Sequence, residues 1–177
     1  MAENTQEMHS VLLSSREFEE IIQTKFIFPE NAKEKLFFVK LLKEIAATQV
    51  GTQLLREFDK NKKITLNLNG TQKGFGEHTM AGEIFVNPQC NAQLLIHELE
   101  HERQLQKGAI GSALSYDHKV INTVLSEVFA RMVEGSFAVE NDTPSWFPSD
   151  AIRINYFKEI LKNKYPHDRN KLWTMAV

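Results

Sequence analysis

The segment His97-Glu98-Leu99-Glu100-His101 places two imidazoles and a carboxylate at a spacing suited to metal-dependent chemistry. Residues four apart lie on the same face of a helix, about 6 Å apart along its axis. Neutral imidazole nitrogens at that spacing can bind one Zn²⁺ ion at about 2.0–2.1 Å. Glu98 would then lie beside the open coordination position, where its carboxylate can accept a proton from water. The pattern therefore indicates a zinc site with an adjacent general base.

The flanks of this motif predict a single buried helix. Asn91 before it and Gly108 after it are typical start and stop residues. Leucine and isoleucine side chains cover much of the expected circumference, which indicates that the helix is largely buried. A buried helix should not present two histidines and a glutamate without partners, and a metal ion would supply them. Glu100 is about 300° around the helix from His97, so we expect it to point toward solvent.

A catalytic zinc site has three protein ligands and a water molecule, so a third donor is required. The candidates downstream are Asp117, His118 and Glu127. A helix is predicted over residues 120–133, and Glu127 falls at the edge of its apolar stripe (positions 121, 124, 125, 128 and 132). A carboxylate at the border of a core is unfavourable unless it is paired, which favours Glu127 as the ligand. The alternatives are an ion pair with a Lys or Arg, or a solvated helix edge.

With these residues the chain resembles the zincin metallopeptidases, and among them the gluzincin type. In that type the third ligand is a glutamate on a second helix, some tens of residues downstream of the histidines. The resemblance implies that His97, His101 and Glu127 bind Zn²⁺ and that Glu98 is the catalytic glutamate. It covers roughly residues 36 to 140.

The chain departs from the patterns of known zincin classes at two places, and these departures limit which residue roles the resemblance implies. Arg131 stands one turn after Glu127, where several gluzincins have an acidic residue that orients a histidine. The groups that orient the histidines of this chain are therefore not given by the resemblance. Gln104 and Lys107 stand where the metzincin class has a glycine and its third histidine, so that class is excluded.

A second similarity lies upstream, in the segment Thr48–Leu55. Its T-x-x-G-x-x-L-L pattern is similar to a segment of small bacterial effector-type metallopeptidases. This similarity suggests that the chain is an effector of that kind.

The remaining sequence predicts an α+β domain around the motif. We expect a flexible N-terminus over residues 1–14 and a single zincin-like metallopeptidase domain over 15–177. The predicted elements are a helix through Phe18–Ile22, a long helix over Ala32–Phe58 that Gly51 divides, strands at Lys63–Asn69 and Gly82–Asn87, the motif helix, the second ligand helix, and a C-terminal helix over about Ser149–Lys164. Such N-terminal helices, a small mixed or antiparallel sheet, and the two ligand helices form the minimal zincin-like fold that the resemblance implies.

The expected mechanism is peptide-bond hydrolysis by a metal-activated water, with Glu98 as general base and then general acid. Candidate donors for stabilising the transition state are Tyr116, His118 and Tyr156, although each is also an ordinary surface or core residue by type. The strand over residues 83–87 is expected either to form the sheet edge that pairs with an extended peptide or simply to complete the sheet.

Two further side chains have a functional and an ordinary interpretation, and the ordinary one is favoured for both. His78 lies in a glycine-rich hairpin, where it could contact substrate, but it is interpreted as an exposed turn histidine. Cys90, just before the motif helix, is interpreted as a packed core residue rather than a thiolate ligand.

The composition and charge of the chain argue against nucleic acid and a membrane as its partners. The formal net charge of −2 gives no basic footprint for nucleic acid, and no apolar run approaches the roughly 18 residues that span a membrane. The N-terminal ten residues lack the pattern of a cleavable secretory leader, and a single cysteine fits a reducing compartment. We therefore expect a protein or peptide substrate and a cytoplasmic location, or export without a signal peptide as an effector. The oligomeric state is not indicated.

Two rival interpretations remain at this stage. One is a catalytically inactive zincin-fold protein that binds a metal or a partner; the presence of Glu98 argues against it, because an inactive protein has no chemical need for that carboxylate. The other is a helical interaction protein in which the motif arose by chance.

Overall fold

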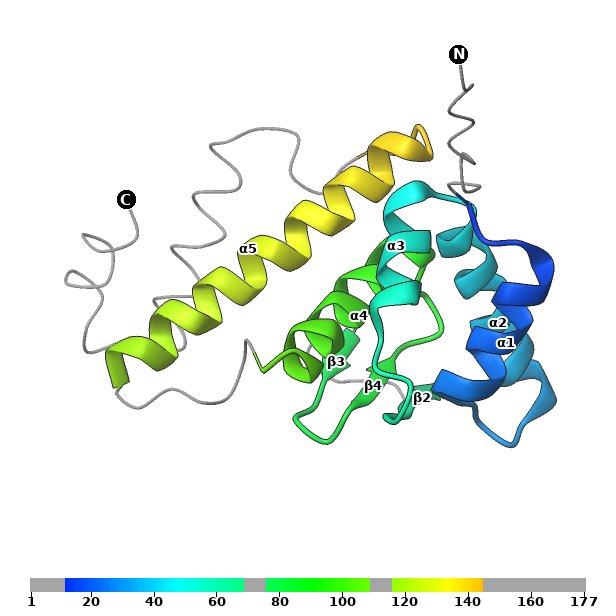
Figure 1. The fold of residues 1–177 in the computed structure, drawn as a ribbon, viewed down its shortest axis with the longest axis horizontal. Helices are drawn as coiled ribbons and strands as arrows, with labels where there is room; N and C mark the ends of the chain where they lie inside the picture. The colour runs from blue at the N-terminus through cyan, green and yellow to red at the C-terminus, as the bar shows by residue number, and fades with distance from the viewer. Residues whose placement is uncertain (1–11, 69–75, 109–115, 145–177) are drawn as a thin grey trace, which may run out of the picture.

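The computed structural model describes residues 12–68, 76–108 and 116–144, without the side chains of 116–121. These residues combine helices and strands, as the sequence predicted (Figure 1). The elements are α1 (Ser15–Lys25), β1 (Phe26–Ile27), α2 (Ala32–Ala46), α3 (Gln49–Glu57), β2 (Ile64–Leu68), β3 (Gly76–His78), β4 (Glu83–Val86), α4 (Ala92–Gln106) and α5 (Tyr116–Glu140). The C-terminal helix predicted near residues 149–164 lies outside the described residues. Within them, no helix is long and apolar enough to cross a bilayer.

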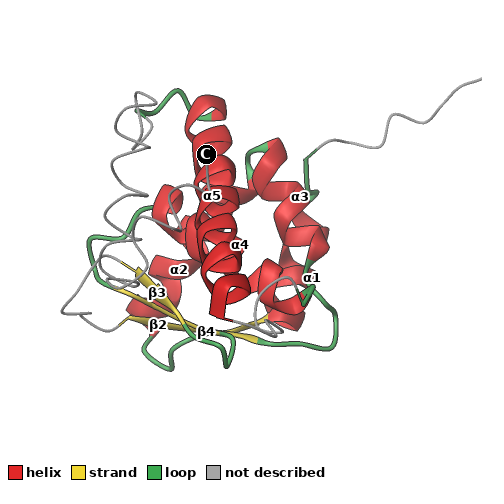
Figure 2. Cartoon of the chain, turned by 90° about the vertical axis from the view of Figure 1, so that its left-hand side faces the viewer, coloured by secondary structure: helices red, strands yellow, loops and turns green. Residues whose placement is uncertain are grey.

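The four strands form one mixed sheet in the order β1-β2-β4-β3. β1, β2 and β4 run parallel, whereas β3 pairs antiparallel with β4. Alternate residues of the central strands are fully buried, namely Ile64, Leu66, Ile84 and Val86, as the two-residue period of a strand requires. Their buried face meets the helices, which lie above the sheet in Figure 2.

Of the two roles expected for the strand at residues 83–87, the structure shows the second. β4 is paired on both sides, with β2 and with β3, so it completes the sheet and is not its open edge. In the described residues the two edge strands are β1 and β3, and β3 is the one that packs against α4. The glycine-rich segment before β4 returns as a strand and covers one side of β4, and Gly82, with φ +76°, makes the reversal possible.

The T-x-x-G-x-x-L-L segment forms the corner between α2 and α3. Thr48 caps α3 by accepting a hydrogen bond from the Gly51 N–H at 3.0 Å, so the long predicted helix divides before Thr48 and not at Gly51. A Cβ atom on Gly51 would lie 2.0 Å from the Ile45 carbonyl oxygen, so only glycine allows this approach. Leu54 and Leu55 enter the core. The pattern therefore has a packing role in this fold.

Two residues of the segment expected to be flexible, Leu13 and Ser14, are held by hydrogen bonds. Ser14 caps α1 in a reciprocal capping box with Glu17, and the Leu13 N–H donates to Thr52 Oγ1 at 3.3 Å. Residues 13 and 14 therefore belong to the folded domain, while residues 1–11 lie outside the described part.

Helix α4 lies at the centre of the molecule and contacts α2, α3, α5, β3 and β4. The face of α5 that meets it differs from the predicted stripe. Large apolar residues of α5 are exposed (Leu125, Phe129, Met132 and Val139), whereas its inner face carries Ser126, Ala130, Glu134 and Phe137. The apolar stripe was misassigned because the inner face of α5 carries polar groups that serve the site on α4.

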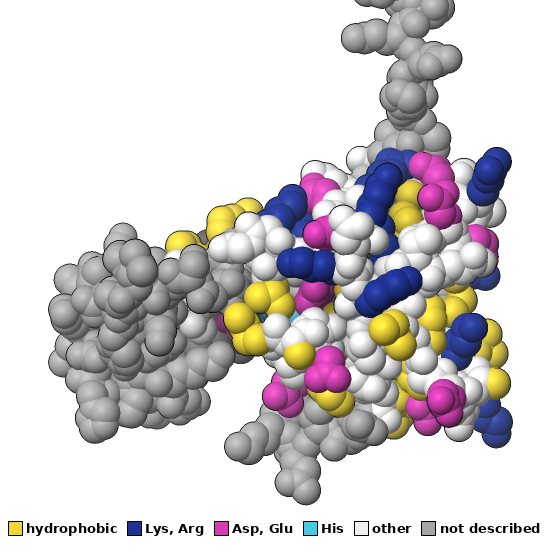
Figure 3. Space-filling model, turned by 60° about the horizontal axis from the view of Figure 1, so that its bottom comes forward, with side chains coloured by type: hydrophobic (Ala, Val, Ile, Leu, Met, Phe, Trp, Pro, Cys, Tyr) yellow, Lys and Arg dark blue, Asp and Glu magenta, His cyan; other side chains and the backbone are white. Residues whose placement is uncertain are grey.

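On the face drawn in Figure 3, acidic and basic side chains are interspersed, with no basic patch. Very little histidine surface is visible there. This agrees with the burial of His97 and His101, whose exposed fractions are 3% and 9%.

Candidate metal centre

The motif helix α4 carries two polar stripes, one that faces α5 and one that faces β3. Asn91 caps α4 by accepting a hydrogen bond from the Leu94 N–H at 2.9 Å. Leu95, Ile96 and Leu99 are fully buried in the core. Residues 97 and 101 face α5, and residues 98 and 102 face β3. Four-residue spacing therefore gives α4 one histidine stripe and one glutamate stripe, side by side.

His97, His101 and Glu127 come together between α4 and α5, as the sequence predicted. The Nε2 atoms of the two histidines lie 3.1 Å apart. The carboxylate of Glu127 lies 3.6 Å from His97 Nε2 and 3.7 Å from His101 Nε2. One ligand atom from each residue can be chosen so that all lie within 4.8 Å of one another, and the group could hold a metal ion.

The spacing of these atoms fits a tetrahedral cation. Bonds of 2.0–2.1 Å at tetrahedral angles separate neighbouring ligand atoms by about 3.3 Å. The distances of 3.1, 3.6 and 3.7 Å lie close to that value. The three groups thus place acceptor atoms close to one another, an arrangement that is unfavourable unless a cation or a proton lies between them. The donor set of two imidazoles and a carboxylate is one that zinc accepts.

Glu134 lies against the other ring nitrogen of His97. Its Oε2 is 3.2 Å from His97 Nδ1, although the direction departs from that of a regular hydrogen bond and Nδ1 has no other partner within the described residues. We therefore describe the contact as electrostatic. A carboxylate at Nδ1 favours a proton there and leaves the Nε2 electron pair for the metal.

Two further side chains hold Glu134, which is only 1% exposed. Arg131 donates to its Oε2, and the Gln93 amide donates to its Oε1 at 3.0 Å. Burial by itself would raise the pKa of Glu134, but the contact with His97 and the charge of Arg131 outweigh burial and lower the pKa. Glu134 is therefore an ionised partner for His97, and Arg131, which departs from the gluzincin pattern, is its counter-ion.

His101 is oriented by a neutral group. Its Nδ1 lies 2.8 Å from the hydroxyl of Ser126, one residue before Glu127 on α5. The Gln104 amide donates to the Ser126 carbonyl at 3.3 Å and ties this turn of α5 back to α4. The two histidines thus have different partners, a carboxylate for His97 and a hydroxyl for His101.

Glu98 faces β3 and lies outside the group of ligand atoms. It is 6% exposed. A Cβ atom on Gly76 would lie 2.8 Å from Glu98 Oε1, so the glycine leaves room for this carboxylate. Burial raises the pKa of Glu98, and the negative charge of Glu127 adds to the effect, while His97, His78 and Arg131 oppose it. Glu98 is therefore placed beside the metal group without being one of its ligands, as expected for a general base.

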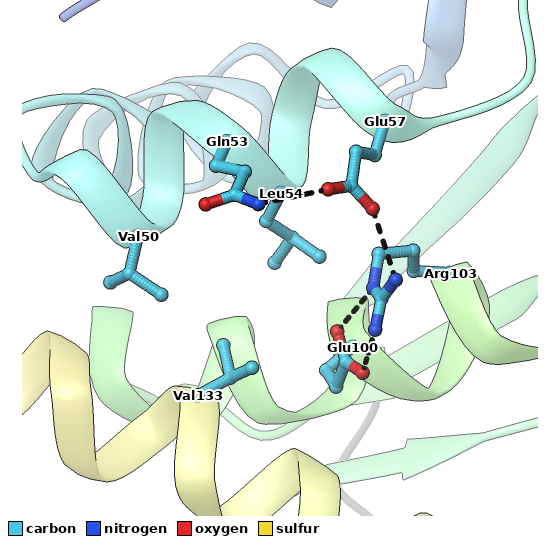
Figure 4. Close-up of a pocket in the computed structure, with 7 residues that line it drawn as sticks. All are labelled: Val50, Gln53, Leu54, Glu57, Glu100, Arg103 and Val133. Atoms are coloured by element: carbon cyan, nitrogen blue, oxygen red, sulfur yellow. Dashed lines mark hydrogen bonds and ion pairs between the residues drawn. The ribbon is translucent and has the colours of Figure 1, made fainter. Parts of the chain in front are cut away.

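The prediction that Glu100 points to solvent is wrong. Glu100 is fully buried, and its two oxygens accept hydrogen bonds from Arg103 at 2.6 Å and one from Gln104 at 2.9 Å. Arg103 also donates to Glu57 of α3 at 3.0 Å. Glu57, Glu100 and Arg103 line the charged side of a hollow between α3, α4 and α5 (Figure 4). Helix α3 covers this side of α4, and the pairing with Arg103 compensates the buried charge.

The interpretation of His78 as an exposed turn histidine is also wrong. His78 lies in β3 and its side chain is 8% exposed. Its Nε2 is 2.7 Å from Glu102 Oε2. Its ring is stacked on that of His101, with the centroids 6.3 Å apart and a tilt of 28°. His78 is therefore part of the wall of the metal centre.

Cys90 is a core residue, as interpreted from the sequence. It is 5% exposed, and its Sγ is directed at the Asn91 carbonyl at 3.3 Å. Burial, with a smaller contribution from the charge of Glu98, raises the pKa of its thiol to about 12. A protonated thiol is not a metal ligand.

The other candidate residues are not placed by their side chains. Tyr116, Asp117 and His118 form the first turn of α5, where only the backbone is described, and Tyr156 lies outside the described residues. Their assignment as third ligands or transition-state donors stays a prediction.

Sequence reasoning missed four partners of the site: Ser126, Glu134, His78 and Glu102. A signal existed for Glu134, because it follows Glu127 by two helical turns and so shares its face of α5. A signal also existed for Glu102, which follows Glu98 by one turn. For His78 and Ser126 the sequence gives no signal, because their roles depend on how β3 and α5 pack against α4.

The chain was compared with protein-family models, with curated proteins and with solved structures, and none of them matches it.

Proposed function

We propose that this protein is a zinc-dependent metallopeptidase of zincin-like fold. The observation that carries the proposal is the convergence of His97, His101 and Glu127 on one point, with Glu98 buried beside them but outside the ligand group. A purely structural metal site commonly has four protein ligands, whereas a catalytic site keeps one position open. Among the side chains that the structure describes, three donors and an adjacent carboxylate correspond to the second arrangement.

Each residue then has a defined task. His97, His101 and Glu127 would hold Zn²⁺, which supplies Lewis acidity that polarises a carbonyl group and acidifies water. Glu98 accepts the proton of the attacking water and passes it to the leaving amine. Its buried position favours holding the proton between the two steps, although the charge of a bound cation acts in the opposite direction.

The edge strand gives this site a place for an extended substrate. β3 pairs with β4 on one side, and Gly76 and His78 on it border Glu98 and Glu102. A peptide that added a strand to the outer side of β3 would place its backbone beside Glu98. A protein or peptide is therefore the substrate class we propose.

The experiment combines metal analysis with a cleavage screen. Purified protein should contain about one equivalent of zinc and should cut members of an unbiased peptide library, with products read by mass spectrometry. Glu98→Gln should retain zinc and lose about 10²–10⁴-fold in kcat, because it removes the proton acceptor. Zinc in both proteins without cleavage in either would favour the inactive metal-binding alternative, and full activity of Glu98→Gln would contradict the proposal.

A further inference from the structure

The edge strand β3 and the glutamate stripe of α4 lie in matched register. Gly76 borders Glu98 and His78 pairs with Glu102. Residues two apart on a strand are about 6.6–6.8 Å apart, and residues four apart on a helix are about 6 Å apart. The pairs therefore align, and Glu77 between them is exposed on the other side of the strand. The imidazole of His78 on β3 therefore lies along the glutamate stripe of α4, which contains the proposed general base Glu98.

Each carboxylate oxygen of Glu102 has a polar partner. The residue is 2% exposed; its Oε2 is 2.7 Å from His78 Nε2, and its Oε1 accepts a hydrogen bond from the Gln106 amide at 2.7 Å. With Nε2 held by the carboxylate, the ring of His78 has Nδ1 left to bind another group. No described residue forms a hydrogen bond with that Nδ1 atom.

His78 lies close to the residues that we propose take part in the reaction. Its ring is stacked on the ring of His101 at a centroid distance of 6.3 Å, and its neighbour on β3, Gly76, borders Glu98. His78 is not among the grouped ligand atoms. His78 therefore lies beside the three candidate metal ligands, on the side of Glu98, and its Nδ1 atom can bind another group.

We propose that His78, held by Glu102, is a further catalytic residue, whose Nδ1 hydrogen-bonds the substrate oxygen on which negative charge develops. The inference rests on the proposed function and adds a residue to it. An imidazolium donates through both nitrogens, here to Glu102 and to the substrate oxygen. A preorganised donor in a buried site stabilises developing charge more strongly than water does.

A tetrahedral anion tests this role without a known substrate. Full-length protein is loaded with Co²⁺, and methylphosphonate binding is followed by the visible spectrum of the metal. Replacing His78→Gln should weaken methylphosphonate binding about 10- to 100-fold, as expected for loss of a charge-assisted hydrogen bond, with Co²⁺ affinity unchanged. Glu77→Gln, on the opposite side of the same strand, should behave as wild type.

Several results would overturn the proposal. These are wild-type affinity for methylphosphonate in His78→Gln, no methylphosphonate binding by the wild type, or loss of Co²⁺ from the His78 variant, which would make His78 a ligand or a structural residue. If His78→Gln does not fold, Glu102→Gln decides in the same assay: weaker methylphosphonate binding with unchanged Co²⁺ affinity supports the role, and unchanged binding rejects it. His78-dependent binding without any peptide cleavage would reject peptide hydrolysis as the function and would leave His78 as an anion-binding residue of the site, not a catalytic one.

Discussion

Two imidazole–carboxylate pairs lie on adjacent flanks of α4, and the carboxylates contact different nitrogens of the two rings. Between α4 and α5, Glu134 lies 3.2 Å from Nδ1 of His97. Between β3 and α4, Glu102 lies 2.7 Å from Nε2 of His78. The first pair leaves Nε2 to converge with His101 and Glu127, whereas the second leaves Nδ1. The nitrogen that each carboxylate occupies thus determines which nitrogen can take part in chemistry.

The two carboxylates also differ in their own partners. Glu134 accepts from the charged Arg131 and from Gln93, whereas Glu102 accepts from the neutral Gln106. A counter-ion keeps Glu134 ionised against His97, as a group that orients a metal ligand requires. We interpret the α5 flank as the side that holds the metal and the β3 flank as the side that meets the substrate.

The largest expected difference between the flanks is in zinc affinity. Glu134→Gln should weaken zinc binding about 10- to 100-fold, because it removes the carboxylate that orients a ligand. Glu102→Gln is the matched control, since it replaces an equally buried glutamate whose histidine is not in the ligand group. Competition with a chromophoric chelator measures both affinities. Equal losses in the two variants would abolish the distinction between the flanks.

A second prediction concerns the space that Gly76 leaves for Glu98. In Gly76→Ala the new methyl group would meet Glu98 Oε1 at 2.8 Å and its Cγ at 3.0 Å. Such overpacking should lower the free energy of unfolding by about 1–3 kcal/mol and displace Glu98, the proposed general base. Gly135→Ala on α5 is the control: no atom lies within 4 Å of its Cβ position, and the helix should gain about 1 kcal/mol. Denaturant titration measures both, and an unaffected Gly76→Ala protein would refute the close packing of β3 on Glu98.

The two glutamates that flank His97 should respond to pH in opposite directions. The lowered pKa of Glu134 gives stability that is present above its ordinary value of 4.5 and is lost as the pH falls through the lowered pKa. The raised pKa of Glu98 gives stability that is present below 4.5 and is lost as the pH rises through the raised pKa. In metal-free protein, Glu134→Gln should therefore flatten the loss of stability in acid, and Glu98→Gln should raise stability near neutral pH. Chemical denaturation across this range tests both signs, and identical pH profiles of the two variants would contradict the assigned shifts.

The smallest effect is expected at the second histidine. Ser126 holds His101 Nδ1 through a neutral hydrogen bond of 2.8 Å. Ser126→Ala should weaken zinc binding by about 1 kcal/mol, or roughly fivefold, less than Glu134→Gln. The same chelator assay measures it. A loss larger than that of Glu134→Gln would reverse the assigned ranking of the two histidine partners.

The local parts of the site were predictable because they depend on a single helix. Four-residue spacing placed His97 and His101 on one face, and the position of Glu127 at the edge of the apolar stripe of a second helix favoured it as a third donor, which the structure brings close to them. The strands flanking the site were also predictable, from the alternation that now buries Ile64 and Ile84.

Other parts of the site could not be predicted from the sequence, because they depend on which element packs against which face of a helix. Glu100 was expected in solvent because helical periodicity cannot reveal that α3 packs over it. The apolar stripe of α5 was assigned to the core, yet its members Leu125 and Met132 are exposed, because the inner face is used by Ser126 and Glu134. Hydrophobic periodicity fails where a buried helix face carries chemistry.

The central claim is that His97, His101 and Glu127 hold one zinc ion. A crystal of the zinc-loaded protein, measured at the zinc absorption edge, tests it most directly through the anomalous signal of the metal. We expect one strong peak at about 2.0–2.2 Å from both Nε2 atoms and from a Glu127 oxygen. No peak between α4 and α5, or a zinc ion bound by other residues, would contradict the account.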